Sequence, residues 1–199
     1  MQNMLAGCSG LTNLQITNWD TSNVTNMQSM FEGCSSLTYL NLSGWDTSSV
    51  EDMSYMFKGC TNLANLNQNF DTSRVTLMNS MFAQCRSITY LDLSNWNTSK
   101  VTDMGSMFIY GISLTGLNLS GWNTSKVKYM NNMFAYDGAL KTINMSNWNT
   151  RKVINMNGMF ANCDRLDTLD LSSWNTTSGT NMGGMFTSCS NLKTIYASA

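Results

Sequence analysis

Hydrophobic and polar positions follow one pattern that recurs about every 26 residues along the chain. The copy from Leu37 to Cys60 reads L-x-x-L-x-L-S-x-W-D-T-S-x-V-x-x-M-x-x-M-F-x-x-C. A fixed period of this length is typical of repeat proteins, whose units stack because none of them buries its apolar face alone. The aromatic position of the pattern recurs at Trp19, Trp45, Phe70, Trp96, Trp122, Trp148 and Trp174.

Each unit contains two apolar stretches that predict two different elements. In residues 37–42 leucines alternate with polar residues, which predicts a short strand with its leucines pointing inward. In residues 50–60 the apolar positions fall at offsets 0, 3, 6, 7 and 10, which predicts one stripe of a short helix or 3-10 segment. The Trp-[Asp/Asn]-Thr-Ser run between them supplies oxygens for capping that helix, and Ser48 with Glu51 matches a capping box.

The predicted fold is therefore an α/β repeat, a solenoid of about seven 26-residue coils. Each coil is expected to hold a short strand plus a short helix or 3-10 segment, in a single domain over residues 1–199. Phe70 stands in a unit shortened by one residue, where Asn-Gln-Asn at 67–69 replaces Asn-Leu-Ser, so we expect an irregular strand there. Gly111 and Asp137 replace the repeat cysteine and Gly179 replaces the valine, which predicts looser packing in those units.

The combined Trp-[Asp/Asn]-Thr-Ser and Met-Phe-x-x-Cys registers resemble the 26-residue surface-protein repeat of the BspA-like leucine-rich-repeat family of bacteria. The resemblance covers nearly the whole chain. It implies a leucine-rich-repeat solenoid, an extracellular or cell-surface location and a role in adhesion or host contact, and it names no receptor. Both ends fall inside a unit without a capping module or a signal peptide, so we expect a fragment of a longer surface protein.

The amino-acid composition argues against most classes of catalytic mechanism. The chain holds 26 Asn, 25 Ser and 22 Thr, but neither Pro nor His, and only 12% of its residues are charged. Without histidine there is no Ser-His-Asp or Cys-His nucleophile pair. Asp164, Asp167 and Asp170 lie together, but a smooth repeated surface does not set two carboxylates across a pocket as glycosidases do. We therefore predict no enzyme activity and no cofactor.

Charge and hydropathy limit the classes of partner that the chain is expected to bind. A formal net charge of −1 argues against nucleic acid and anionic membranes as partners. No apolar run approaches the roughly 20 residues that span a bilayer, so no membrane insertion is expected.

The repeated Met, Cys and aromatic positions predict buried core residues rather than a metal or cofactor site. The methionine pairs and the phenylalanine after them recur in every unit at inward spacing, and the tryptophans predict a stacked column with indole N–H groups bonded to the loop. The cysteines lack metal-site spacing and form a ladder of buried thiols or of disulfides between coils, since stacked strands lie about 5 Å apart. The ladder comprises Cys8, Cys34, Cys60, Cys85, Cys163 and Cys189.

The outward strand positions are the candidate ligand contacts. Solenoids commonly bind partners on such extended surfaces, and exposed tyrosines are efficient contact residues. We expect Tyr39 and Tyr90, which stand one outward site and so two residues before the ladder, to contact a host extracellular protein, a mucin or a glycan; the alternative is a merely solvated face. The amide and carboxylate ladder comprises Asn41, Asn67, Asp92, Asn118, Asn144 and Asp170, flanked by Gln15 and Tyr196.

A second candidate surface is a basic edge. The position before the valine carries a cation in four consecutive coils, and the net charge is −4 over residues 1–99 and +3 over residues 100–199. Such an edge attracts anionic glycan or wall polymer, or is simply solvated, and the charge asymmetry favours head-to-tail self-association. A structural spacer or end-to-end assembly is thus the alternative function. The edge comprises Arg74, Lys100, Lys126 and Lys152.

The threonine before the serine also recurs once per coil, which resembles the threonine arrays of ice-binding solenoids. Helix capping accounts for that column equally well.

Overall fold

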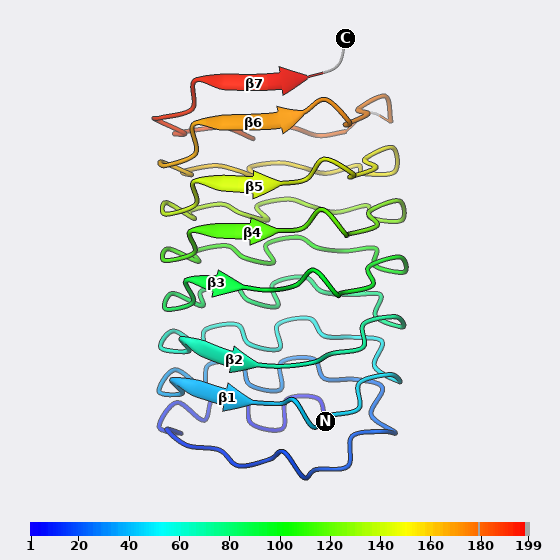
Figure 1. The fold of residues 1–199 in the computed structure, drawn as a ribbon, viewed down its shortest axis with the longest axis vertical. Helices are drawn as coiled ribbons and strands as arrows, with labels where there is room; N and C mark the ends of the chain where they lie inside the picture. The colour runs from blue at the N-terminus through cyan, green and yellow to red at the C-terminus, as the bar shows by residue number, and fades with distance from the viewer. Residues whose placement is uncertain (179, 198–199) are drawn as a thin grey trace.

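A computed structural model describes residues 1–178 and 180–197, so Gly179 and the packing expected around it lie outside the described residues. The chain winds into a solenoid that makes about six turns from its first strand to its last, one strand per turn (Figure 1). The seven strands are β1 (Tyr39–Asn41), β2 (Asn65–Asn67), β3 (Tyr90–Leu91), β4 (Gly116–Asn118), β5 (Thr142–Asn144), β6 (Thr168–Leu171) and β7 (Thr194–Ala197).

The strands form one wall of the solenoid and pair in parallel with the strands of neighbouring coils. Three sheets result, β1–β2, β3–β4–β5 and β6–β7, and Leu40 pairs with Leu66 in the first of them. Leu40, Leu91 and Leu117 are buried while the residues before them face outward, which confirms the predicted alternation. The sheet breaks between β2 and β3, where the unit is one residue short, and again between β5 and β6, where the unit has its regular length. The predicted irregularity of the short unit is confirmed by its turn, in which Gln68 Oε1 accepts from Phe70 N.

The predicted helix or 3-10 segment is wrong, because the described residues contain no helix. In the Met-Phe stretch alternate N–H groups reach the next coil: Ser29 N donates to Ser54 O at 2.9 Å and Phe31 N to Met56 O at 2.9 Å. Met30 N closes a tight turn on Met27 O at 3.2 Å, and Ser29 has a φ of 54°, which a right-handed helix excludes. The bonds between coils thus take the N–H groups that a helix would use internally.

The helix-capping interpretation fails with the helix. Asp46 Oδ1 accepts a hydrogen bond from Ser48 N at 2.9 Å, which closes a turn in which a side chain mimics the backbone. The threonine column is buried from Thr21 to Thr150, whereas Thr176 is exposed, and Thr47 Oγ1 donates to Asp71 O of the next coil at 3.0 Å. The threonines therefore tie coils together, and burial removes them as an ice-binding array.

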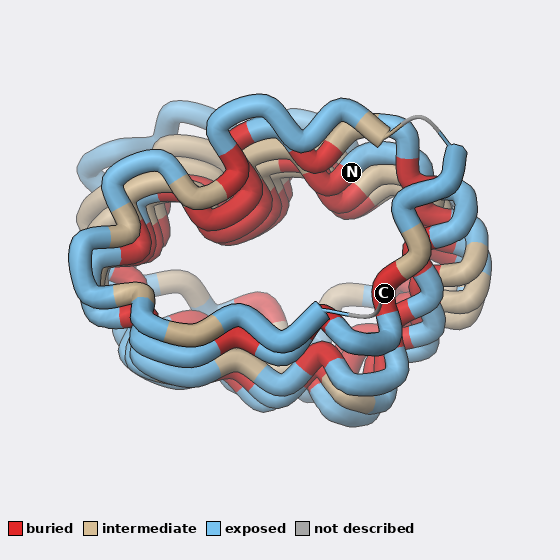
Figure 2. Tube along the Cα trace, turned by 90° about the horizontal axis from the view of Figure 1, so that it is seen from above, coloured by how far each residue is buried: buried red, intermediate tan, exposed pale blue. Residues whose placement is uncertain are grey.

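The Met-Phe stretches form the wall opposite the strands, and they are joined from coil to coil by parallel bridges. The core fills the space between these two walls, and buried positions line the interior of the ring (Figure 2). The predicted columns are confirmed: the rings of Phe31 and Phe57 stack at 5.6 Å, and those of Trp96 and Trp122 at 6.3 Å. The indole of Trp122 donates to Leu93 O at 3.1 Å. The methionine pairs are buried in the inner coils, whereas Met4 and Met182 in the outermost coils are exposed.

Candidate binding surfaces

The strand face presents three large aromatic side chains to solvent, the two predicted tyrosines and Tyr196 in β7. Tyr39 in β1 is 53% exposed and Tyr90 in β3 is 63% exposed, because the strand alternation turns the following leucines inward. The predicted exposure of both tyrosines is confirmed.

The polar ladder on the same face has a structural role that sequence reasoning missed. Its side-chain oxygens accept hydrogen bonds from the backbone two residues later, as between Asn41 Oδ1 and Ser43 N at 3.1 Å. Asp92, Asn118, Asn144 and Asp170 form the same turn. The recurring Asn-x-Ser triplet was the available signal.

The two acidic members of the ladder are anionic and exposed. Hydrogen bonds from the Ser94 hydroxyl and backbone lower the pKa of Asp92, and Ser172 lowers the pKa of Asp170 in the same way. In each turn one carboxylate oxygen, Oδ1, accepts the serine hydrogen bonds. The carboxylates of Asp92 and Asp170 are therefore negative charges at the solvent-exposed face of the ladder.

Asn67 lies in the short coil, where a different side chain closes the turn. Gln68 Oε1 accepts from Phe70 N at 3.0 Å. Beside this turn the surface is hollowed into a cavity of about 140 Å³, which we call the notch. Sequence reasoning marked the short unit but did not foresee the notch. Its lining residues are Gln68, Asn69, Phe70, Asp92, Asn95 and Trp96.

The basic edge is exposed in all four of its coils. Lys58–Glu32 and Lys193–Asp167 are the salt bridges within residues 1–178 and 180–197, so no cation of the edge is paired there. The edge is thus a row of unpaired positive charges on successive coils.

The cysteine ladder is a row of free thiols that donate to the preceding coil. Cys60 Sγ donates to Phe31 O at 3.1 Å, and all six cysteines are free. Burial raises the pKa of Cys34 to about 11 and that of Cys60 to about 12. Because the thiolate is the nucleophile and the metal ligand, these protonated thiols are structural.

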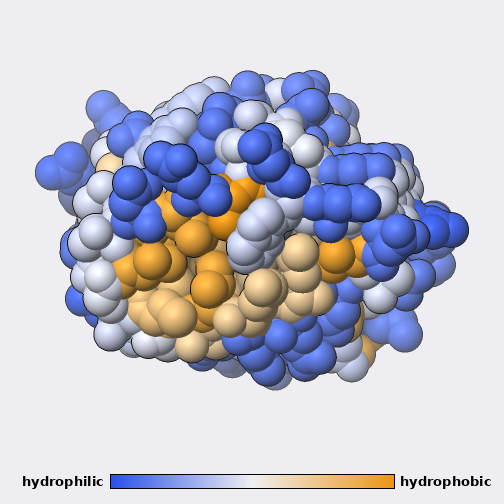
Figure 3. Space-filling view, turned by 90° about the horizontal axis from the view of Figure 1, so that it is seen from below, coloured by the Kyte–Doolittle hydropathy of each residue, from blue (hydrophilic) through white to orange (hydrophobic). Residues whose placement is uncertain are grey.

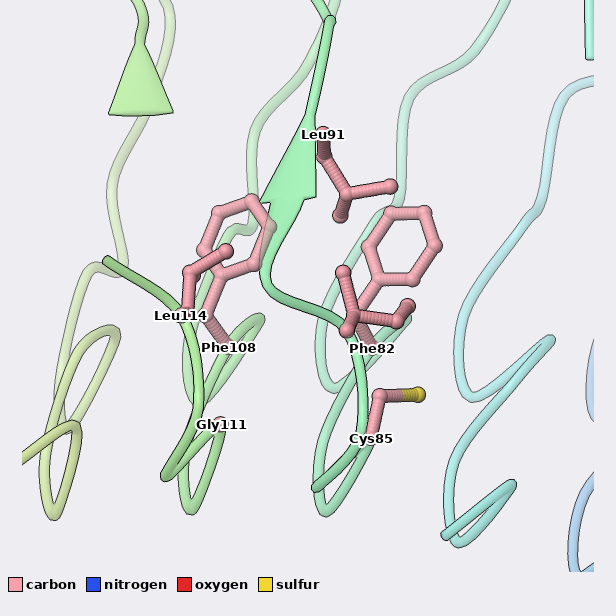
Figure 4. A pocket seen from close by; sticks show the side chains of 7 residues that line it. Phe82, Cys85, Leu91, Phe108, Gly111 and Leu114 are labelled. Carbon is pink, nitrogen blue, oxygen red and sulfur yellow. The ribbon is translucent and has the colours of Figure 1, made fainter. Parts of the chain in front are cut away.

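The two units that lack the repeat cysteine differ from each other. A cavity of about 10 Å³ lies beside Gly111, Cys85 and Phe108 (Figure 4). A Cβ at Gly111 would nevertheless lie 3.0 Å from Phe108 O and 3.1 Å from Asp137 Oδ1, so the looser packing expected at this unit is not found around the glycine itself. Asp137 is buried, and its Oδ1 accepts from Gly111 N at 2.6 Å. Burial raises the pKa of Asp137 well above its usual value and so favours the neutral form of the carboxyl that stands in place of the thiol.

Two negative observations concern the described ranges alone. They contain no helix long and apolar enough to cross a membrane. They also contain no cluster of three His, Cys, Asp or Glu side chains that would hold a metal ion.

A family model described as "Mycoplasma protein of unknown function, DUF285" matches residues 1–116 and 111–198. The chain belongs to the DUF285 family. No curated protein matches it.

Two solved structures are similar to this DUF285 chain. One is a leucine-rich repeat protein from Bacteroides ovatus, with 17% identity and a TM-score of 0.44, covering 100% of this chain and 58% of that one. The other is a leucine rich cell surface protein from Faecalibacterium prausnitzii, with 15% identity and a TM-score of 0.38, covering 100% of this chain and 69% of that one. Both similarities are distant and say nothing of what this chain binds.

The DUF285 solenoid exposes apolar surface at both ends of its stack. Figure 3 shows such a patch on the face seen from below, the end that carries the N-terminus. At the other end a cavity of about 480 Å³ lies among Trp174, Met182, Phe186 and Ile195.

Proposed function

We propose that this chain is a non-catalytic module of a bacterial surface protein that binds a host extracellular protein, mucin or glycan through its strand face. The observation that carries the proposal is the exposure of Tyr39 and Tyr90, each by more than half, on the strand face. Tyrosine supplies a large contact area with few rotatable bonds and is enriched among residues that dominate binding energy. The surface location rests on the resemblance to BspA-like repeats.

The test is a binding screen of the purified chain against extracellular-matrix proteins, mucins and glycans, followed by a double variant. Tyr39→Ser with Tyr90→Ser is expected to weaken binding to the partner at least about tenfold, because each loses a contact worth roughly 1 kcal/mol or more. Tyr129→Ser is the matched control, since Tyr129 is 39% exposed but lies on the opposite wall, where it pairs with Asp103 and Asn155. Unchanged binding by the double variant would show that the face is wrong.

Salt dependence separates the strand face from the basic edge. Binding through Lys100, Lys126 and their neighbours is expected to fall steeply from low to physiological salt, because exposed charges are screened over about 8 Å at physiological ionic strength. Binding through the tyrosines is expected to survive. If salt abolishes binding, and Lys100→Ala and Lys126→Ala abolish it as well, the binding surface is the basic edge rather than the strand face.

A second candidate function is end-to-end assembly, which the apolar surfaces at both ends of the stack favour. The two different ends would meet in a head-to-tail contact, which generates open filaments when the rotation does not close. Light scattering should then show oligomers that grow with concentration. Met182→Lys, in the apolar cavity at one end, is expected to abolish them, and a monomer at every concentration would exclude assembly.

A further inference from the structure

At Trp45, Trp122 and Trp148, each of which follows a coil of regular length, the buried indole N–H has the same kind of acceptor. It donates to the carbonyl three residues before the aromatic residue of the preceding coil, as Trp122 does to Leu93 O and Trp148 to Leu119 O, both at 3.1 Å. The same carbonyl also accepts the backbone bond that closes its own turn, since Trp96 N donates to Leu93 O at 3.1 Å. By this rule the acceptor for Trp96 is Asn67 O.

The short coil uses that carbonyl differently. Asn67 O accepts from Leu42 N of the preceding coil at 2.7 Å, and Phe70 N donates to Gln68 Oε1 instead. Trp96 is only 4% exposed, and its Nε1 has no hydrogen-bond partner among the described residues. An unpaired buried donor costs about 1–3 kcal/mol, so this N–H is a strong attachment point for an oxygen that reaches it.

The notch beside Trp96 offers that oxygen room and further partners. Its volume of about 140 Å³ is several times the roughly 10–15 Å³ that one water needs. Its walls carry the Gln68, Asn69 and Asn95 carboxamides, which both donate and accept, and the Asp92 carboxylate, which accepts only. The structure therefore places the side chain of Trp96, whose N–H is unpaired among the described residues, beside a set of planar polar groups at the break between β2 and β3.

The chemistry of the walls selects the ligand. An anion would meet the Asp92 carboxylate, and a cation would leave the Trp96 N–H unpaired. An apolar group would leave the whole polar wall unpaired, at a cost in free energy. A hydroxyl accepts from the indole N–H and donates its own hydrogen to a carboxylate or amide oxygen, so a neutral compound with several hydroxyls satisfies every wall.

We propose that the notch binds one neutral sugar residue, with a hydroxyl oxygen accepting from Trp96 Nε1 and neighbouring hydroxyls bonded to Asp92 and the carboxamides. The inference deepens the proposed function and rests on it in part, because Asp92 belongs both to the notch and to the ladder of the strand face. It identifies a glycan as the partner of that face.

The indole N–H signals of the ¹⁵N-labelled chain test the proposal directly. The six tryptophans give six signals, and Trp96→Phe identifies the one that belongs to Trp96. The probes are neutral hexoses, a deoxyhexose and N-acetylhexosamines at around 100 mM, which detects a Kd in the millimolar range. At least one sugar is expected to shift the Trp96 signal saturably and leave the other five in place. No saturable shift, as for a notch that holds water alone, overturns the proposal.

Asp92→Ala and Asp46→Ala form a matched pair. Both aspartates are exposed and accept from the backbone N–H of a serine two residues later, so both variants lose the same kind of turn, but Asp46 belongs neither to the notch nor to the ladder. Asp92→Ala is expected to weaken sugar binding at least about tenfold, because a hydrogen bond to a charged group is lost, while Asp46→Ala binds as the parent does. Equal affinities of the two variants overturn the assignment.

Restoring the missing residue should remove the site. A leucine inserted between Asn67 and Gln68 gives the short coil its regular length, so Trp96 Nε1 should find a backbone acceptor and its signal should become protected from hydrogen exchange and insensitive to sugars. Unchanged sugar binding by a folded insertion variant overturns the proposal. Asn69→Ala, which keeps the chain length, provides a second variant and is expected to weaken binding severalfold.

The tyrosine variants keep this inference separate from the proposed function. If sugars shift the Trp96 signal but Tyr39→Ser with Tyr90→Ser leaves glycan and protein binding intact, the strand-face function fails and the notch stands. If the tyrosine variant abolishes binding of a macromolecule while no sugar moves the Trp96 signal, the notch fails and the strand face stands. A saturable shift produced by a peptide and by none of the sugars also overturns the sugar assignment.

Discussion

The coil that carries Leu93 and the short coil that carries Asn67 make the same corner with different numbers of residues. In the first, one carbonyl accepts both the N–H of Trp96 and the indole N–H of Trp122. In the second, the equivalent carbonyl accepts neither and instead bonds Leu42 N. Because the hydrogen bonds of a solenoid run between coils, the loss of one residue is felt by the coil that follows, at Trp96.

The aromatic column records the same difference. The rings of Trp96 and Trp122 are parallel to within 1°, whereas Phe70 and Trp96 are inclined by 35° at almost the same separation. The sheet also breaks at this level, between β2 and β3. A repeat therefore tolerates a short unit without unwinding, and the indole N–H of Trp96 is left without an acceptor among the described residues.

The largest expected effect is on stability, when an aromatic side chain is truncated in the regular column and, for comparison, in the short coil. Trp122→Ala should destabilise the chain by about 3–5 kcal/mol, because it opens a cavity in a stack whose other members cannot close it. Phe70→Ala should cost less, about 3 kcal/mol at most, because Phe70 borders the notch and water can enter the space left behind. Urea unfolding measures both, and equal losses would remove the distinction between the coils.

The next effect concerns Asp137, which stands where regular coils have a cysteine. Its pKa is raised in the folded chain, so its contribution to stability is greatest below the unfolded-state pKa of about 3.9 and is lost at about 1.4 kcal/mol per pH unit as the pH rises toward the folded value. Asp137→Asn keeps an oxygen for Gly111 N and does not ionise. We expect its stability to exceed that of the parent by a margin that grows as the pH rises above about 4.

Asp170→Asn is the control for the Asp137 prediction. The pKa of Asp170 is lowered by its hydrogen bonds with Ser172, so its contribution has the opposite sign and is lost as the pH falls. Urea unfolding across this pH range distinguishes them. A margin for Asp137→Asn that is flat with pH would mean that Asp137 does not change its ionisation on folding.

The walls and core of this fold could be predicted because the burial of Leu40 or Met53 depends only on the period of the repeat. The helix could not be distinguished from successive turns, because a spacing of three residues suits both. What decides is whether an N–H such as that of Ser29 bonds within its segment or to Ser54 O of the next coil. A sequence pattern does not carry that choice.

The candidate site divides in the same way. The exposure of Tyr39 and Tyr90 followed from strand alternation and is confirmed. The notch could not be predicted, because it depends on which donor Asn67 O accepts, and both outcomes are compatible with the short unit. The signal that the sequence did hold was the one-residue deficit before Phe70.

A smaller effect tests the indole hydrogen bond itself. Trp122→Phe removes a bond to Leu93 O and should cost about 1 kcal/mol more than Trp96→Phe, which removes an N–H that has no partner among the described residues. Both substitutions remove the same apolar area, so the difference isolates the hydrogen bond. Thermal and urea unfolding measure it, and equal costs would show that solvent already satisfies Trp96.

The smallest expected effect concerns the turns that follow the strands. Asn118 Oδ1 accepts from Ser120 N at 3.3 Å and from the Ser120 hydroxyl at 2.8 Å, so Asn118→Ala should cost roughly 0.5–1.5 kcal/mol. In the short coil the corresponding turn is closed by Gln68, so Asn67→Ala should cost no more than a surface substitution, about 0.5 kcal/mol. Gln68→Ala should then destabilise the chain about as much as Asn118→Ala does, because Phe70 N loses its acceptor. If Asn67→Ala and Asn118→Ala proved equally destabilising, the short coil would close its turn as the regular coils do, and the carbonyl of Asn67 would again be within reach of Trp96.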